Sequence, residues 1–164
     1  MKAIEIALEI RPTVILQDLV CRDLVEKELV RRFRTQQDLY KVPLIVLSGT
    51  EVAEVKAEAF ALGANDYMVK LPNALEVIAR IRYHSQGYIN LLEREAAMAR
   101  VTWLAEHDPL TACLNRRTWH EGLDDAIVTL ALDEALVLAI CDIDFFKKVN
   151  DTYGHQCGDH AIQH

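Results

Sequence analysis

Short runs of branched aliphatic residues alternate with longer amphipathic stretches over the first 70 residues, and this alternation limits the possible folds more than any other feature. The apolar runs occupy residues 13–19, 44–47 and 67–69. Runs of this length are typical of strands that are buried on both faces. Apolar residues at helical spacing occupy the stretches 3–10, 24–40 and 51–62. Strands and helices that alternate in this order predict an α/β fold with a parallel sheet.

The next segment, residues 73–106, contains no proline and only one glycine, Gly87. Its apolar residues recur at helical and near-heptad spacing, which predicts one or two long helices. Two interpretations fit this pattern: a stalk that connects two domains, or a lid on the preceding core. Because His107-Asp108-Pro109 disfavours helical backbone, the helix should end there.

A second alternation of helix and strand follows residue 109. Residues 117–132 have a helical pattern, and residues 135–141 form a strongly apolar run that predicts a strand. Asp142-Ile143-Asp144 ends this run, and a polar turn over 150–154 leads into what should be a further helix.

The charge balance is acidic, since 18 Lys and Arg stand against 25 Asp and Glu for a formal net charge of −7. An acidic chain lacks the positive field that drives general binding to duplex nucleic acid. No apolar stretch approaches the roughly 18 residues that span a bilayer, and Glu5 and Glu9 interrupt any signal-peptide core. We therefore expect a cytoplasmic protein with no nucleic-acid or membrane partner.

Three polar residues, Asp18, Ser48 and Lys70, each stand at the carboxyl end of a predicted strand. Ligands and reactive groups gather at that edge of an open parallel sheet, so the three side chains should converge. A carboxylate can accept a phosphoryl group, while a hydroxyl and an ammonium stabilise the transferred oxygens.

A second polar cluster follows the predicted strand 135–141. Carboxylates at Asp142 and Asp144 suit a hard cation, and the turn through Phe145-Phe146-Lys147 can present backbone amides and an ammonium to phosphates. A carboxylate complements the adjacent N1–H and N2–H₂ donors of guanine, and an amide can complement its remaining edge. Further polar and glycine residues recur at fixed offsets: Asn150, Gly154, His155, Gly158 and Asp159.

The first cluster resembles the receiver domain of bacterial response regulators, and residues 13–20 and 64–82 are most similar to receivers of Wsp-type diguanylate cyclase regulators. The resemblance implies a phosphoacceptor, a switch hydroxyl, a lysine and a switch aromatic at Asp18, Ser48, Lys70 and Tyr67, respectively. The family's magnesium-binding acidic pair has no counterpart in this sequence, and Cys21-Arg22 replaces its usual Met-Pro. Because phosphoryl transfer needs that metal, we expect no normal phosphorylation of this chain.

The second cluster, with Asp108-x-Leu110-Thr111 and Leu114-Asn115-Arg116-Arg117 upstream, is similar to the start of the GGDEF family of diguanylate cyclases. The resemblance implies a metal site at Asp142 and Ile143 for Mg²⁺ or Mn²⁺, with Asp142 and Lys147 as catalytic residues. It implies GTP contacts from Phe145, Phe146, Lys147, Asn150 and Asp159. Asp144 is either a metal ligand or a structural partner of the turn. Turn packing is the favoured role of His155, and helix capping and structural pairing are the favoured roles of Asp108, Asn115 and Arg116.

The two resemblances together imply three parts. Residues 1–84 would be a partial receiver with a flavodoxin-like parallel sheet, and 85–107 a helical stalk or linker. Residues 108–164 would be the N-terminal part of a GGDEF domain, whose fold is nucleotide-cyclase-like α+β.

The implied function is a two-component response regulator that condenses two GTP into cyclic di-GMP, with an upstream histidine kinase as partner and a homodimer as the active form. The sequence contains no Gly-Gly pair, so the family's metal-binding hairpin is missing and we expect the chain alone to be inactive. One alternative is a non-catalytic module that pairs through its receiver and stalk with an intact regulator and inhibits it. Another is an unrelated nucleotide-binding α/β domain.

Overall fold

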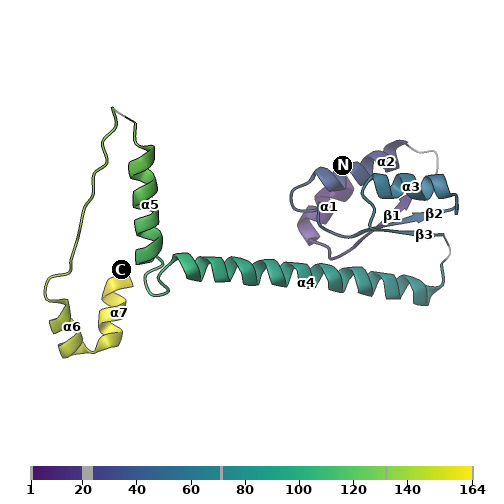
Figure 1. The fold of residues 1–164 in the computed structure, drawn as a ribbon. Helices are drawn as coiled ribbons and strands as arrows, with labels where there is room; N and C mark the ends of the chain where they lie inside the picture. The colour runs from purple at the N-terminus through teal and green to yellow at the C-terminus, as the bar shows by residue number, and fades with distance from the viewer. Residues whose placement is uncertain (1, 20–23, 71, 132, 164) are drawn as a thin grey trace. The chain divides into compact units, whose positions relative to one another are not determined.

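The computed structural model describes residues 2–19, 24–70, 72–131 and 133–163. Its contacts divide the chain into two compact units, Met1–Glu95 and Ala96–His164. Figure 1 shows the elements of both units along the chain.

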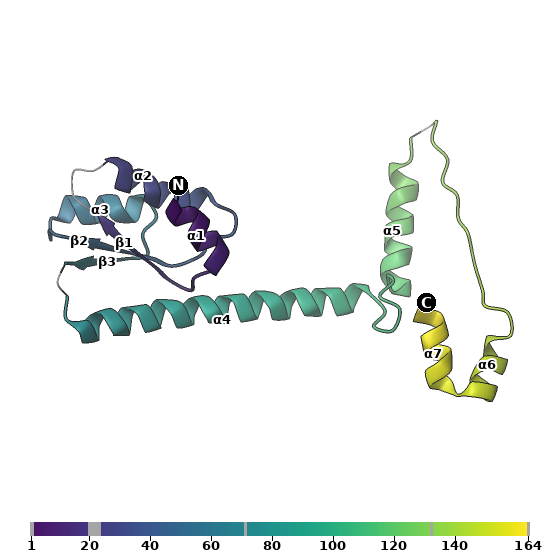
Figure 2. The same cartoon turned by 180° about the vertical axis from the view of Figure 1, so that it is seen from behind.

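The first unit contains a three-stranded parallel sheet in the order β1-β2-β3. Its strands are β1 (Ile15–Leu19), β2 (Leu44–Ser48) and β3 (Asp66–Val69). Its helices are α1 (Lys2–Ile10), α2 (Leu24–Thr35), α3 (Ala53–Ala61) and the first part of α4 (Ala74–Glu106). Helices α1 to α3 lie on one side of the sheet and the first part of α4 lies on the other (Figures 1 and 2). The predicted alternation of strands and helices is confirmed.

The central strand β2 carries the core, because both of its faces are covered. Leu44, Ile45 and Val46 are fully buried. The residues that pack with them include Val30 and Phe33 of α2, Ala59 of α3, and Leu39, Val42 and Tyr67. The order of the sheet therefore fixes the positions of the residues that follow β1, β2 and β3.

Helix α2 ends earlier than its sequence pattern predicts. The pattern extends to residue 40, whereas the helix ends at Thr35 and turns follow, with the N–H groups of Leu39 and Tyr40 donating to the Gln36 carbonyl. The turns bring Leu39 into the core, where it is 1% exposed. Burial of this side chain outweighs the propensity of residues 36–40 for helix.

Helix α4 is a single continuous helix of 33 residues. Gly87 lies inside it without interrupting it, at a cost of about 1 kcal/mol relative to alanine. The Leu75 N–H donates to Asn73 Oδ1 at the start, and the helix ends at Glu106, before the predicted break at Pro109. Within the described ranges, none of the helices combines the length and apolarity that crossing a membrane requires.

The second unit contains the end of α4 with α5 (Arg116–Thr129), α6 (Phe146–Tyr153) and α7 (His155–Gln163). The predicted strand over 135–141 is wrong: residues 134–143 have no regular secondary structure, and Val137 and Ile140 are 88% and 89% exposed. A strand is stable only when its backbone pairs with a neighbouring strand, and the described part of this unit contains no β-strand. The α+β architecture expected for this unit is therefore not formed by its described residues.

Candidate functional site

The carboxyl ends of the three strands meet at one edge of the sheet. Residue pairing places Ser48 beside Leu19 and Val69, and Asp18 beside Leu47. Lys70, directly after β3, places its Nζ 2.6 Å from Asp18 Oδ1, and its N–H donates to the Ser48 carbonyl over 2.6 Å. The side chains of Asp18 and Lys70 meet as predicted, whereas Ser48 contacts Lys70 through its backbone carbonyl.

The ion pair between Asp18 and Lys70 is open to water, with side chains 55% and 38% exposed. An exposed pair of this kind contributes at most about 1 kcal/mol, because water screens the charges. Both groups can therefore exchange their partner at little cost. A cavity of about 390 Å³, lined by residues that include Tyr67, Lys70 and Lys56, lies at the same edge.

The two remaining predicted residues of this edge point inward. Ser48 is fully buried, and Tyr67 is 5% exposed with its hydroxyl donating to the Thr50 carbonyl. Over the described part of the chain, no group of three His, Cys, Asp or Glu residues is arranged to hold a metal ion. The Cys21-Arg22 replacement lies outside the described residues.

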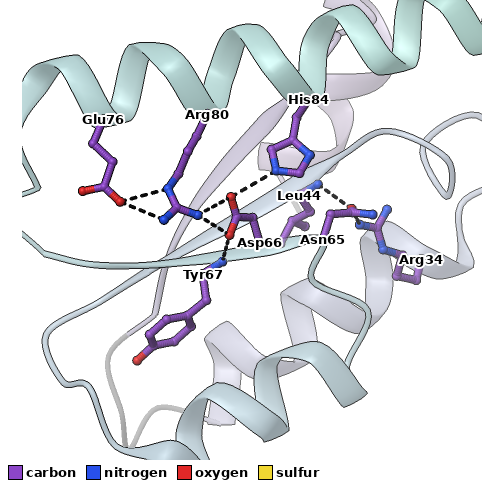
Figure 3. A network of polar contacts seen from close by, with 8 residues as sticks. All are labelled: Arg34, Leu44, Asn65, Asp66, Tyr67, Glu76, Arg80 and His84. Carbon is purple, nitrogen blue, oxygen red and sulfur yellow. Dashed lines mark hydrogen bonds and ion pairs between the residues drawn. The ribbon is translucent and has the colours of Figure 1, made fainter.

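A polar network joins the start of β3 to α4 (Figure 3). Asp66 accepts two hydrogen bonds from Arg80, at 2.7 and 2.8 Å, and one from the Tyr67 N–H at 2.8 Å. His84 Nε2 lies 3.0 Å from the same carboxylate, and Glu76 binds the far side of the Arg80 guanidinium. Burial acts to raise the pKa of Asp66, but the hydrogen bonds from Arg80, His84 and Tyr67 outweigh it and hold that pKa below its ordinary value.

Arg34, at the end of α2, binds four oxygen atoms of surrounding loops. Its Nε donates to the Gly63 carbonyl at 2.8 Å, and its two terminal nitrogens donate to the Tyr40 and Val42 carbonyls and to Asn65 Oδ1. Burial lowers the pKa of Arg34. Neither Arg34 nor the Asp66 network was predicted from the sequence. One signal was available for the network: Glu76, Arg80 and His84 follow one another at intervals of four residues, which places them on one face of a helix.

The predicted metal and phosphate residues of the second unit lie where the extended segment meets α6. Asp142 and Lys147 are exposed, and Phe145 adopts a left-handed backbone with φ 58° directly before the helix. The Phe146 N–H donates to the Ile143 carbonyl at 3.3 Å. Two groups predicted to bind phosphate and metal therefore bind each other, through a long hydrogen bond that a ligand can replace.

The donors at Asp142 and Ile143 are a carboxylate and a backbone carbonyl, both of them oxygen. Mg²⁺ favours oxygen ligands and commonly takes one or two carboxylates, with water and substrate phosphates in its other positions. The two donors are therefore of the chemical type that Mg²⁺ or Mn²⁺ binds.

Helices α6 and α7 bring the two predicted guanine residues into the same neighbourhood. Asn150 Oδ1 is buried against Gly158, the residue before Asp159. No hydrogen bond reaches this atom from the described residues. Gly154 joins the two helices with φ 84°, a backbone conformation that favours glycine, and its N–H donates to the Asn150 carbonyl.

Capping residues hold the turn between α4 and α5, as the sequence predicts for Asp108 and Asn115. Asn115 Oδ1 accepts from the Thr118 N–H at 3.0 Å, while its Nδ2 donates to the Ala105 carbonyl at 2.7 Å. Hydrogen bonds to Asp108, that from the Thr111 N–H foremost, hold the pKa of Asp108 below its usual value. Arg117, which sequence reasoning did not single out, also binds the Ala105 carbonyl.

The family model described as "Diguanylate cyclase, GGDEF domain" matches residues 105–164. Residues 105–164 are therefore similar to the GGDEF family. The matched segment contains the capping turn, the residues around Asp142 and Lys147, and the pair of helices that carries Asn150 and Asp159.

Curated relatives of the chain include response regulators and diguanylate cyclases. "Response regulator PleD" of Caulobacter vibrioides is 31% identical over 134 residues, which cover 79% of this chain and 29% of PleD. "Diguanylate cyclase DgcS" of Shewanella oneidensis is 38% identical over 60 residues, which cover 36% of this chain and 20% of DgcS. The chain thus spans less than a third of the length of these relatives. The PleD match is longer than the segment that the family model matches, so it includes residues outside 105–164.

Solved receiver domains also resemble this chain. The receiver domain of RstA from Klebsiella pneumoniae matches with a TM-score of 0.44 and 24% identity, covering 51% of this chain and 69% of that one. The receiver of a modulated diguanylate cyclase from Desulfovibrio desulfuricans matches with a TM-score of 0.43 and 22% identity, covering 53% and 68%.

Proposed function

We propose that this chain is part of a response regulator that condenses two GTP molecules into cyclic di-GMP. The observation that carries the proposal is the pairing of α6 and α7, which sets the Asn150 amide against Gly158, the residue before Asp159. Lys147 lies one turn before Asn150 on α6, and Asp142 lies just upstream. One short stretch thereby offers groups for the metal, the phosphates and the base of a guanine nucleotide.

In the proposed complex, the Asp159 carboxylate accepts hydrogen bonds from guanine N1–H and N2–H₂, and the Asn150 amide binds the remaining edge. Lys147 and the backbone amides of Phe145 and Phe146 bind the phosphates. Asp142 and the Ile143 carbonyl would hold Mg²⁺ or Mn²⁺, which when bound offsets the charge that builds up on the phosphates. The attacking 3′-hydroxyl comes from a second GTP on a partner domain.

For the first unit we propose the role of a receiver. Asp18 is the phosphoacceptor position and faces the Lys70 ammonium at 2.6 Å, with Ser48 and Tyr67 as the switch residues. A histidine kinase is the proposed partner. Since Asp18 has no cluster of acidic metal ligands around it within the described ranges, we expect acetyl phosphate and Mg²⁺ to leave the 164-residue polypeptide unphosphorylated.

The proposed arrangement consists of a receiver over 1–84, a helical linker over 85–107 and a GGDEF segment over 108–164, in a cytoplasmic protein. A homodimer is the proposed active form, because two GTP-loaded domains must face each other. Ala96, Ala99 and Trp103 of α4 are exposed and recur at near-heptad spacing, which suits packing against a second helix.

The test of this function is an assay for cyclic di-GMP with the protein that the complete reading frame encodes. With GTP and Mg²⁺ it should yield cyclic di-GMP, and Asp142→Ala should lower the rate by about 100-fold or more, because a metal ligand is lost. Asp151→Asn, a change at an exposed position of the same stretch, should leave the rate within about twofold of wild type. The 164-residue polypeptide alone should yield no product, since it contains no Gly-Gly pair.

A second candidate function is a non-catalytic module that pairs with an intact regulator and inhibits it. The exposed residues Ala96, Ala99 and Trp103 on α4, which suit packing against another helix, favour it. A complete reading frame whose product makes no cyclic di-GMP, but slows an active regulator on mixing, would select this candidate over the first.

A further inference from the structure

Gly158 occupies a position where a side chain would collide with Asn150. A Cβ added at Gly158 would lie 1.8 Å from Asn150 Oδ1, 2.8 Å from its Cγ and 3.3 Å from its Nδ2. The first two separations are far below ordinary van der Waals contact, so the amide in this position and a Cβ cannot share the space. In contrast, a Cβ at Gly122, inside α5, would meet nothing within 4 Å.

The backbone conformation of Gly158 does not explain why glycine stands there. The residue lies within α7 and its N–H donates to the Gly154 carbonyl, and its φ is not among the positive values found at Gly63 and Gly154. In ordinary helical backbone, glycine is less favourable than alanine by a factor of about five in the equilibrium between helix and coil at that position. The space taken by the Asn150 amide is therefore the structural reason that a side chain is excluded.

The amide oxygen of Asn150 is buried in this space and has no hydrogen-bond partner among the described residues. A buried oxygen without a hydrogen bond is unfavourable. The amide is therefore held against α7 by its packing on Gly158 and not by a hydrogen bond to this oxygen. Gly158 immediately precedes Asp159, and any displacement of the amide changes its position relative to the Asp159 carboxylate.

We infer that Gly158 is a positioning residue for Asn150: its missing side chain admits the Asn150 amide against α7 and so sets the amide beside Asp159 for guanine. This inference rests on the proposed function, because it gives the amide a nucleotide to bind. Replacement of Gly158 by alanine turns the amide outward, since the short Asn150 side chain moves more easily than two packed helices.

The test compares four variants of the 164-residue chain: Gly158→Ala, Asn150→Ala, the double variant, and Gly122→Ala as the matched glycine control. GTP binding in Mg²⁺ is measured by calorimetry, and unfolding of the second unit by the fluorescence of Trp103 and Trp119, which both lie in it. The side-chain amide signals of Asn150 in a ¹⁵N–¹H spectrum report the position of the amide.

Gly158→Ala should weaken GTP binding by about tenfold, nearly as much as Asn150→Ala, and the double variant should bind no more weakly than Asn150→Ala alone. Gly158→Ala should also move the Asn150 side-chain signals toward those of an exposed amide, and Gly122→Ala should not. The melting temperature should fall by about 3 °C in Gly158→Ala but not when the same change is made in the Asn150→Ala chain.

The inference is overturned if Gly158→Ala leaves the Asn150 signals in place, or lowers the melting temperature equally in both backgrounds. Equal losses would mean that glycine serves the backbone of α7 and not Asn150. If the wild-type chain does not bind GTP, the proposed nucleotide site fails, while the amide signals and melting temperatures still decide whether Gly158 positions Asn150.

Discussion

Arg34→Ala should lower the free energy of unfolding of the first unit by about 4 kcal/mol. The guanidinium donates to three backbone carbonyls and to Asn65 Oδ1, over 2.6 to 2.9 Å. Hydrogen bonds from a charged donor contribute about 1.5 to 3 kcal/mol each, though not additively. Because the acceptors lie in the loops before β2 and β3, their loss should loosen the entry to both strands.

A urea titration followed by the amide signals of β2 measures this effect, because that strand lies at the centre of the sheet. Arg32→Ala is the matched control on the same helix: Arg32 forms an exposed ion pair with Glu28, four residues earlier, and the substitution should change stability by about 0.5 kcal/mol or less. Similar losses for Arg34→Ala and Arg32→Ala would show that Arg34 does not brace the loops.

Asp66→Asn should lower the stability of the first unit by about 2 kcal/mol at pH 7. The substitution keeps the size of the side chain but removes the charge that binds Arg80 at 2.7 Å and lies 3.0 Å from His84. These are the contacts that join the end of the β2–β3 connection to α4 in Figure 3. Asp38→Asn, at an exposed position, should change stability by less than about 0.5 kcal/mol.

The contribution of Asp66 should depend on pH in a defined direction. Because hydrogen bonds hold its folded pKa below the unfolded value, the stabilisation is complete above the unfolded pKa and is lost as the pH falls through the folded pKa. The stability difference between wild type and Asp66→Asn should therefore be constant from pH 7 to about pH 5 and shrink below about pH 4. A difference that grows as the pH falls over that range would contradict this account of the network.

The hydrophobic pattern of short segments predicted the helices and strands of the first unit well, because residues close in sequence determine these elements. Branched residues in 13–19 and 44–47 and the spacing of the helices determined the order of the elements, and parallel strands necessarily brought Asp18 and Lys70 to one edge. The contacts of Arg34 and the Asp66 network could not be predicted in this way. Arg34 contacts residues up to 31 positions away, and its partners are mostly backbone carbonyls, which every residue type carries.

The strand predicted over 135–141 fails for a related reason. Apolar composition indicates how favourable the burial of a segment is, whereas a strand also needs a second strand whose backbone forms hydrogen bonds with it. Val137 and Ile140 satisfy the first condition and, in the described structure, remain exposed. The caps at Asp108 and Asn115 were predictable because their partners lie within three residues; the exclusion of a side chain at Gly158 was not, because it depends on the packing of α6 on α7.

The measurement that tests the central claim most directly is nucleotide selectivity. Calorimetric titration of the 164-residue chain in Mg²⁺ should show saturable binding of GTP that is at least about tenfold tighter than binding of ATP, since Asp159 complements donors that adenine lacks. Asp159→Asn should abolish that preference while Asp151→Asn retains it. Equal affinity for GTP and ATP, or a preference that survives Asp159→Asn, would contradict the assignment of residues 142–159 as a guanine nucleotide site.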